Sequence, residues 1–194
     1  MVCHLDEPPP GASTALVREI RRLLAAGGRR RAFLPRVPAD LTIPTPLALY
    51  SATLQAAADG RVLTAAQPSG WQYLVLERDQ VVGLAEMSWE GRFSRLAYTP
   101  AVGRIDRALT RLVARAEQVP GDLVLRMLRV PALAILAVWL HGTSFDRLVT
   151  LPPTHGRLRP SQLYTGARFE AVLRDAGQAE LKRGAPRRRL NPKP

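Results

Sequence analysis

The fold is decided by residues 71–98, which read WQYLVLERDQVVGLAEMSWEGRFSRLAY. Apolar and polar side chains alternate along this stretch with a period of two, which is typical of half-buried β-strands. The pattern predicts strands at Tyr73–Glu77 and Val81–Met87, joined in a hairpin around residues 78–80, and a third strand at Phe93–Tyr98. Consecutive strands with short turns imply an antiparallel meander.

Helical periodicity precedes and follows this meander. It predicts a helix over residues 13–26, a second over 45–57 and a third over 99–118. The second and third each begin with a Thr-Pro pair, in which threonine can cap the helix and proline suits its first turn. The stretch between the second helix and the meander also allows a short strand at 62–66, in addition to the three strands of the meander.

The remainder of the chain predicts three more strands and one helix. The strands are expected at Leu123–Val130, Ala132–Leu140 and Arg147–Leu151, and the helix at Gly166–Ala176. Residues 132–140 are apolar throughout, so periodicity alone allows a strand buried on both faces or a short buried helix. The alternation of larger side chains favours the strand.

The predicted order is helix, helix, three strands, helix, three strands, helix. It indicates an α+β protein with an antiparallel sheet of about five to six strands and helices packed on it. This order resembles the profilin-like group, which includes roadblock and related sensor domains, and also the secretion-chaperone-like fold, over roughly residues 46–176. Either resemblance implies a scaffold for binding or dimerisation more than an enzyme. The expected organisation is a disordered lead at 1–12, a basic helix and Pro-rich connector at 13–44, one α+β domain at 45–181 and a basic disordered tail at 182–194.

Positive charge is concentrated in two arms. The formal net charge is +12. Residues 18–36 carry seven Arg against one Glu, a net of +6, and residues 182–194 carry six basic residues and no acid, again +6. The intervening residues 37–181 carry fifteen Arg against thirteen acids, only +2. A nearly neutral body with two basic arms indicates an acidic partner. Arg outnumbers Lys 26 to 2, which suits phosphate recognition but is also typical of a GC-rich bacterial genome.

The candidate contacts for nucleic acid or another acidic partner are arginines of the two arms and of a stripe along the third predicted helix. They are Arg29, Arg30, Arg31, Arg104, Arg107, Arg111, Arg115, Arg187, Arg188 and Arg189. The stripe recurs at intervals of three and four residues, and the same spacing suits the solvated side of an amphipathic helix. The two arms together contain a single aromatic residue, Phe33, that could stack on bases, which argues against single-strand recognition.

Two arginines lie in the otherwise apolar strand at 123–130. Alternation places Arg126 and Arg129 on opposite faces, and an inward arginine needs a carboxylate partner, for which Glu86 and Glu77 are candidates. Such a pair could line a ligand site. It could equally be a cross-strand pair on an exposed sheet face.

Evidence for catalysis is confined to one turn. His141 and Asp146 could form a couple, with Ser144 the nearest nucleophile, but no nucleophile elbow surrounds the serine. Phosphate-binding glycine loops are missing, and the single Cys3 excludes an internal disulfide or a cysteine zinc site. No cofactor is therefore expected.

We expect a cytoplasmic protein with no membrane partner. The sequence patterns lead to three hypotheses for its function. The first is a non-enzymatic binding or adaptor module that acts through protein contact or self-association. The alternative is sequence-independent association with nucleic acid through the basic arms. The third is a small enzyme that uses His141. The N-terminus has no signal peptide, and the longest apolar stretch, nine residues, is about half a membrane span.

Overall fold

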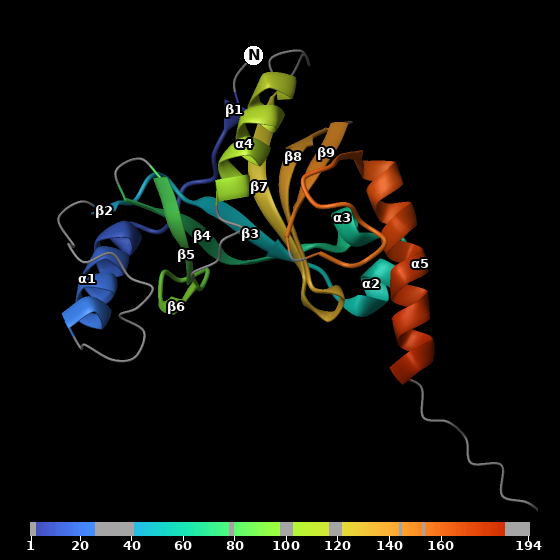
Figure 1. The fold of residues 1–194 in the computed structure, drawn as a ribbon, viewed down its shortest axis with the longest axis horizontal. Coiled ribbons are helices and arrows are strands. Elements are labelled where there is room, and N and C mark those ends of the chain that lie inside the picture. The colour runs from blue at the N-terminus through green and yellow to red at the C-terminus, as the bar shows by residue number, and fades with distance from the viewer. Residues whose placement is uncertain are drawn as a thin grey trace, which may run out of the picture.

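The computed structural model describes residues 3–25, 41–77, 80–97, 103–116, 122–143, 145–152 and 154–184 (Figure 1). In chain order the elements are β1 (Cys3–His4), α1 (Ala12–Ala25), β2 (Leu41–Thr42), β3 (Leu47–Ser51), α2 (Leu54–Ala58), α3 (Val62–Ala65), β4 (Gln67–Glu77), β5 (Gln80–Met87), β6 (Phe93–Ala97), α4 (Gly103–Ala116), β7 (Leu123–Val130), a 3-10 helix (Pro131–Leu133), β8 (Ile135–Gly142), β9 (Phe145–Leu151), β10 (Leu163–Thr165) and α5 (Gly166–Gly184).

The described strands form one mixed sheet. Eight of them follow the order β10-β9-β8-β7-β3-β4-β5-β6, while β1 pairs with β7 and β2 pairs with β4. The antiparallel meanders β4-β5-β6 and β7-β8-β9 lie on either side of β3. Strand β3 runs antiparallel to β4 and parallel to β7, with Ala48 opposite Arg126 and Ser51 opposite Arg129. The two meanders therefore meet at a parallel seam.

The α+β class is confirmed, but the predicted sheet is wrong in two respects. It has more strands than five or six, and it is mixed because β3 and β1 both run parallel to β7. The predicted element order also differs from the observed one, so the order on which the profilin-like and secretion-chaperone-like resemblances rest is not the order of this chain.

The largest error concerns residues 45–57, where one helix was expected. The chain instead forms β3, then a short helix, α2. Leu47, Ala48 and Leu49 are all buried, because a central strand is covered on both faces and shows no alternation. The helix cap is Thr53, whose hydroxyl oxygen accepts a hydrogen bond from the Ala56 amide at 3.1 Å. The strand expected at 62–66 is likewise wrong, since Val62–Ala65 is the helix α3.

Both ends of the chain hold more structure than expected. Residues 3–12, expected to be a disordered lead, contain β1, which pairs with Leu123 and Val124. The C-terminal helix continues to Gly184, beyond the expected start of the tail at 182, and β10 precedes it. The remainder of the expected tail, 185–194, lies outside the described residues.

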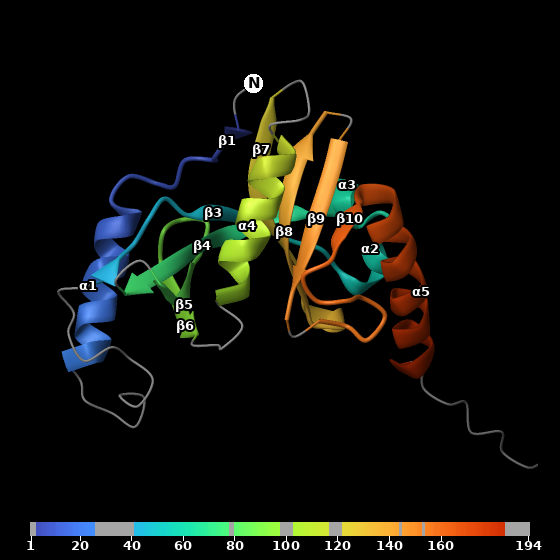
Figure 2. The same ribbon diagram turned by 45° about the horizontal axis from the view of Figure 1, so that its top comes forward.

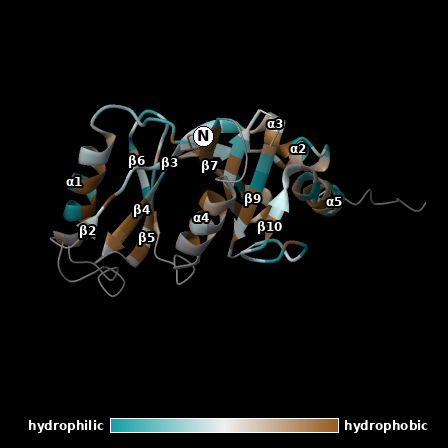
Figure 3. Ribbon diagram, turned by 90° about the horizontal axis from the view of Figure 1, so that it is seen from above, coloured by the Kyte–Doolittle hydropathy of each residue, from teal (hydrophilic) through white to brown (hydrophobic). Residues whose placement is uncertain are grey.

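Helices cover both faces of the sheet (Figures 2 and 3). On β3, Ala48 packs in a cluster with Leu16 and Ile20 of α1, and the next residue, Leu49, packs with Ile105 and other residues of α4. Tyr50 packs against both the α1 cluster and the cluster that contains α2 and α5. Successive strand residues point to opposite faces, so α1, α2 and α5 share one face and α4 covers the other. Hereafter we call the latter the α4 face.

Candidate ligand pocket

A pocket of about 450 Å³ opens on the α4 face of the sheet. Four segments converge there: the β5-β6 hairpin, the first turn of α4, the connection from β7 to β8, and the end of β9. The lining residues that the structure describes are mostly apolar, and none of these is aromatic: Leu84, Arg95, Ile105, Arg129, Pro131, Ala134, Ile135, Leu136, Leu151 and Pro152.

The pocket has a buried apolar floor and a more exposed rim. Leu84, Ile105 and Leu151 are buried and belong to one hydrophobic cluster of the core. The exposed rim includes residues of the β7-β8 connection, where Ala134 adopts the left-handed conformation with φ of 50°. This conformation costs about 1–2 kcal/mol for a residue with a Cβ atom. The rest of the connection must therefore hold Ala134 in place.

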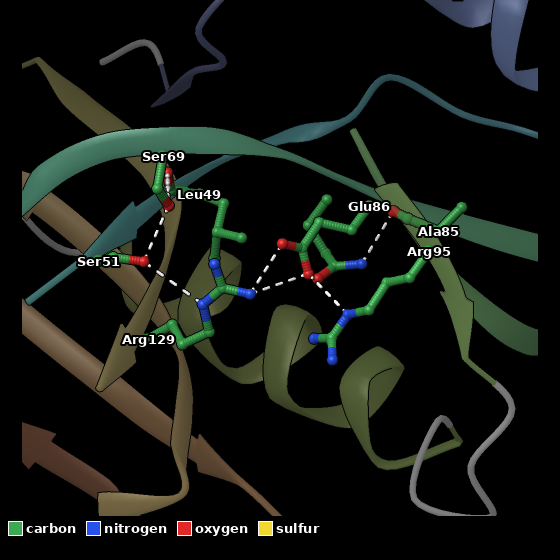
Figure 4. A network of polar contacts seen from close by, with 8 residues as sticks. Leu49, Ser51, Ser69, Ala85, Glu86, Arg95 and Arg129 are labelled. Atoms are coloured by element: carbon green, nitrogen blue, oxygen red, sulfur yellow. Dashed lines mark hydrogen bonds and ion pairs between the residues drawn. The ribbon is translucent and has the colours of Figure 1, made fainter. Parts of the chain in front are cut away.

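A charged network forms the polar side of the pocket (Figure 4). The Glu86 side chain is only 9% exposed. Arg129 Nη1 donates to both carboxylate oxygens of Glu86, at 2.8 and 2.9 Å, and Arg95 Nε donates to Oε2 at 2.8 Å. A buried carboxylate is stable when it is paired and hydrogen-bonded in this way.

Two serine residues orient the Arg129 side chain through a chain of hydrogen bonds. Arg129 Nε donates to Ser51 Oγ at 3.4 Å, and the Ser51 hydroxyl donates to Ser69 Oγ at 2.9 Å. The Ser69 hydroxyl in turn donates to the Leu49 carbonyl oxygen at 3.0 Å. The parallel seam between β3 and β7 thus fixes the orientation of the Arg129 guanidinium (Figure 4).

Two cations share one anion in this network, so it carries a formal charge of +1. Within the described ranges, three guanidinium nitrogens of these arginines donate no hydrogen bond. They are Nη2 of Arg129 and both terminal nitrogens of Arg95. Arg129 is 25% exposed and Arg95 is 57% exposed. Both arginines line a pocket whose other described lining residues are apolar, and their guanidinium groups can donate to an anion there.

The sequence predicted part of this site. The pairing of Arg129 with Glu86 is confirmed, as is the placement of Arg126 on the opposite face. Arg126 pairs with Asp6 at 3.0 Å instead of with either predicted glutamate. Sequence reasoning missed Arg95, although it lies directly opposite Glu86 in the hairpin. The signal in the sequence was the predicted hairpin itself, which brings residues of the two strands opposite each other. Facing residues of opposite charge attract each other, so Arg95 was a candidate partner for Glu86.

A second polar cluster lies on the other face of the sheet. His141 Nδ1 and Asp146 Oδ1 are 2.9 Å apart, which confirms the predicted couple, and the Trp139 indole donates to the same oxygen at 2.7 Å. The Arg126 guanidinium lies over the Tyr50 ring at 4.6 Å. Ser144, the predicted nucleophile, lies outside the described residues. The use of His141 in catalysis stays a prediction.

The arginine candidates for nucleic-acid contact remain untested. Residues 29–31 and 187–189 lie outside the described ranges. Arg104, Arg107, Arg111 and Arg115 fall within α4, and their helical backbone is confirmed, but their side chains are not among those described. Association with nucleic acid, with a protein partner or with a second copy of the chain therefore stays a prediction.

Comparison of this chain with known families, proteins and structures identified no similar protein: no protein-family model, curated protein or solved structure matches it. Among the described residues, no helix is both long enough and apolar enough to span a membrane. The described side chains also contain no group of three or more potential metal ligands.

Proposed function

We propose that the protein is a binding module, and that the pocket on the α4 face is its site for a small molecule with an apolar body. The observation that carries this proposal is the pocket of about 450 Å³ with a buried floor of Leu84, Ile105 and Leu151. Ligand sites are typically concave, mostly apolar and about 300–1,000 Å³ in volume, with a few fixed polar groups.

The construction of the walls supports the proposal. The floor residues come from β5, α4 and β9, and all three belong to the same hydrophobic cluster of the core. A pocket built on packed strands and a helix needs little reordering when a ligand enters, which favours affinity. Ala134 at the rim adds a second argument, because backbone strain in folded proteins is concentrated at functional sites.

The test is binding of N-phenyl-naphthylamine, a neutral probe that becomes fluorescent in apolar sites. The variant Leu136→Trp places a bulky side chain in the pocket. Leu163→Trp is the matched control, since Leu163 is 38% exposed on β10 and does not line the pocket. We expect saturable binding to the unmodified chain and to L163W, and at least tenfold weaker binding to L136W. Equal binding by both variants, with both folded, would refute the proposed site.

A further inference from the structure

The charge of the network on the pocket wall allows the ligand class to be narrowed. We infer that the ligand is a monocarboxylate with an aliphatic chain, and that Glu86 selects for a single negative charge. This inference rests on the proposed function, because it concerns the same pocket. It adds the ligand's charge, the geometry of its head group and the nature of its body.

The positive charge argues for an anionic ligand. The buried carboxylate of Glu86 is already shared by Arg95 and Arg129, so one of the two guanidinium charges has no counter-ion within the network. Both arginines are among the residues that line the pocket. A neutral ligand would cover them without supplying a full charge, whereas an anion compensates the remaining charge and accepts their hydrogen bonds.

The same network argues for one negative charge and a planar head group. A monoanion brings the formal charge of the network from +1 to zero. A dianion such as a phosphate monoester would leave an excess negative charge beside Glu86, which repels it in a partly buried site. A carboxylate is planar and matches the fork of a guanidinium group, with two parallel hydrogen bonds.

The remaining lining argues for an aliphatic body and for a small molecule. The described lining side chains other than the arginines are leucine, isoleucine, alanine and proline, with no aromatic ring to stack on another. Pro131 and Pro152 line the pocket and lack the backbone N–H that an extended peptide would need as a pairing partner. A free fatty-acid-like molecule requires no such pairing.

The experiment is displacement of the bound neutral probe at pH 8 by three ligands that share one eight-carbon chain. These are octanoate, octanol and octyl phosphate, which carry one negative charge, none and nearly two, respectively. We expect octanoate to bind at least tenfold more tightly than octanol and more tightly than octyl phosphate. Each further methylene in the carboxylate should improve affinity about fourfold until the pocket is filled.

Two substitutions separate the contributions of the charges. Arg95→Gln lowers the formal charge of the network to zero, and we expect octanoate to bind about tenfold more weakly while octanol is unaffected. Arg92→Gln is the matched control, because Arg92 is an exposed arginine of the same hairpin that does not line the pocket. Glu86→Gln raises the charge to +2, and we expect it to favour octyl phosphate over octanoate by about tenfold relative to the unmodified chain.

The outcomes distinguish this inference from the proposed function. If the neutral probe does not bind, the proposed function fails. If the probe binds but octanoate and octanol are equivalent, or octyl phosphate binds best, only the inferred ligand class is overturned. Tighter binding of an acetylated hexapeptide ending in leucine than of octanoate would also overturn it, in favour of a peptide C-terminus. The three-ligand comparison and R95Q decide the question even if E86Q fails to fold.

Discussion

Removal of Glu86 should reveal how strongly the charged network is coupled to the stability of the sheet. In Glu86→Leu, the Arg129 guanidinium loses its two bonds to the carboxylate while 75% of its side chain remains buried. Breaking a buried ion pair on one side typically costs about 3–5 kcal/mol. Because Arg129 retains some contact with water, we expect the lower end, about 3 kcal/mol.

Simultaneous replacement of both partners should be much less harmful. Glu86→Leu with Arg129→Met leaves no unpaired buried charge, because Arg95, which also loses its partner, is 57% exposed to water, so we expect a loss of about 1 kcal/mol or less. The coupling energy between the two sites should then be at least 2 kcal/mol. Arg95→Gln should cost less than about 1 kcal/mol, because Arg95 is 57% exposed and water screens its ion pair.

Urea unfolding at neutral pH, followed by tryptophan fluorescence and circular dichroism, measures these free energies. For a domain of this size, 3 kcal/mol corresponds to a fall in the melting temperature of about 6–12 °C. Two results would contradict the reasoning: a loss below 1 kcal/mol in E86L, or losses that simply add in the double variant. Either would mean that the network is solvated and does not constrain the pocket.

Three further predictions concern packing, backbone strain and pH. Gly177→Ala should destabilise the chain by about 1–3 kcal/mol in urea unfolding, because the new Cβ would lie 2.6 Å from the Ala58 backbone nitrogen, where α5 meets α2. Gly184→Ala, at the open end of the same helix, should be neutral. Ala134→Gly should stabilise the fold by about 1 kcal/mol, seen as a higher melting temperature, since glycine adopts positive φ without strain. Burial raises the pKa of the Tyr73 phenol above its ordinary 10.0. The associated stability is therefore present below about pH 10 and is lost as pH rises further, so Tyr73→Phe should reduce the alkaline loss measured by urea unfolding; an unchanged alkaline profile would contradict this.

The strands of the two meanders could be predicted from the sequence where buried and more exposed residues alternate. In β7, for example, Leu123, Leu125 and Met127 are buried while Val124 and Arg126 are partly exposed. The central strand β3 could not, because residues on both of its faces are buried. Leu47, Tyr50 and Leu54 happen to be spaced like one face of a helix. The prediction of the element order was therefore wrong at β3, where the sheet is covered on both faces.

The candidate site also has one part that could be predicted from the sequence and another that could not. The need of an inward arginine for a carboxylate is a local rule of electrostatics, and it led to Arg129 and Glu86. The pocket itself depends on where the first turn of α4 meets the β7-β8 connection, which no local pattern specifies. The pair of Arg126 with Asp6 joins residues 120 positions apart. Charge pattern alone cannot select one aspartate among several at that range.

The parallel seam has a consequence for the order in which the chain folds. Each meander closes through short turns, whereas the hydrogen bond between Ser51 and Arg129 joins residues 78 positions apart. Loop-closure entropy grows with that separation, by about 0.6 kcal/mol for each doubling of loop length. The seam should therefore form after the two meanders, and substitutions within it should accelerate unfolding more than they slow folding. Kinetic persistence of the native state, and with it of the pocket, would then be governed by β3.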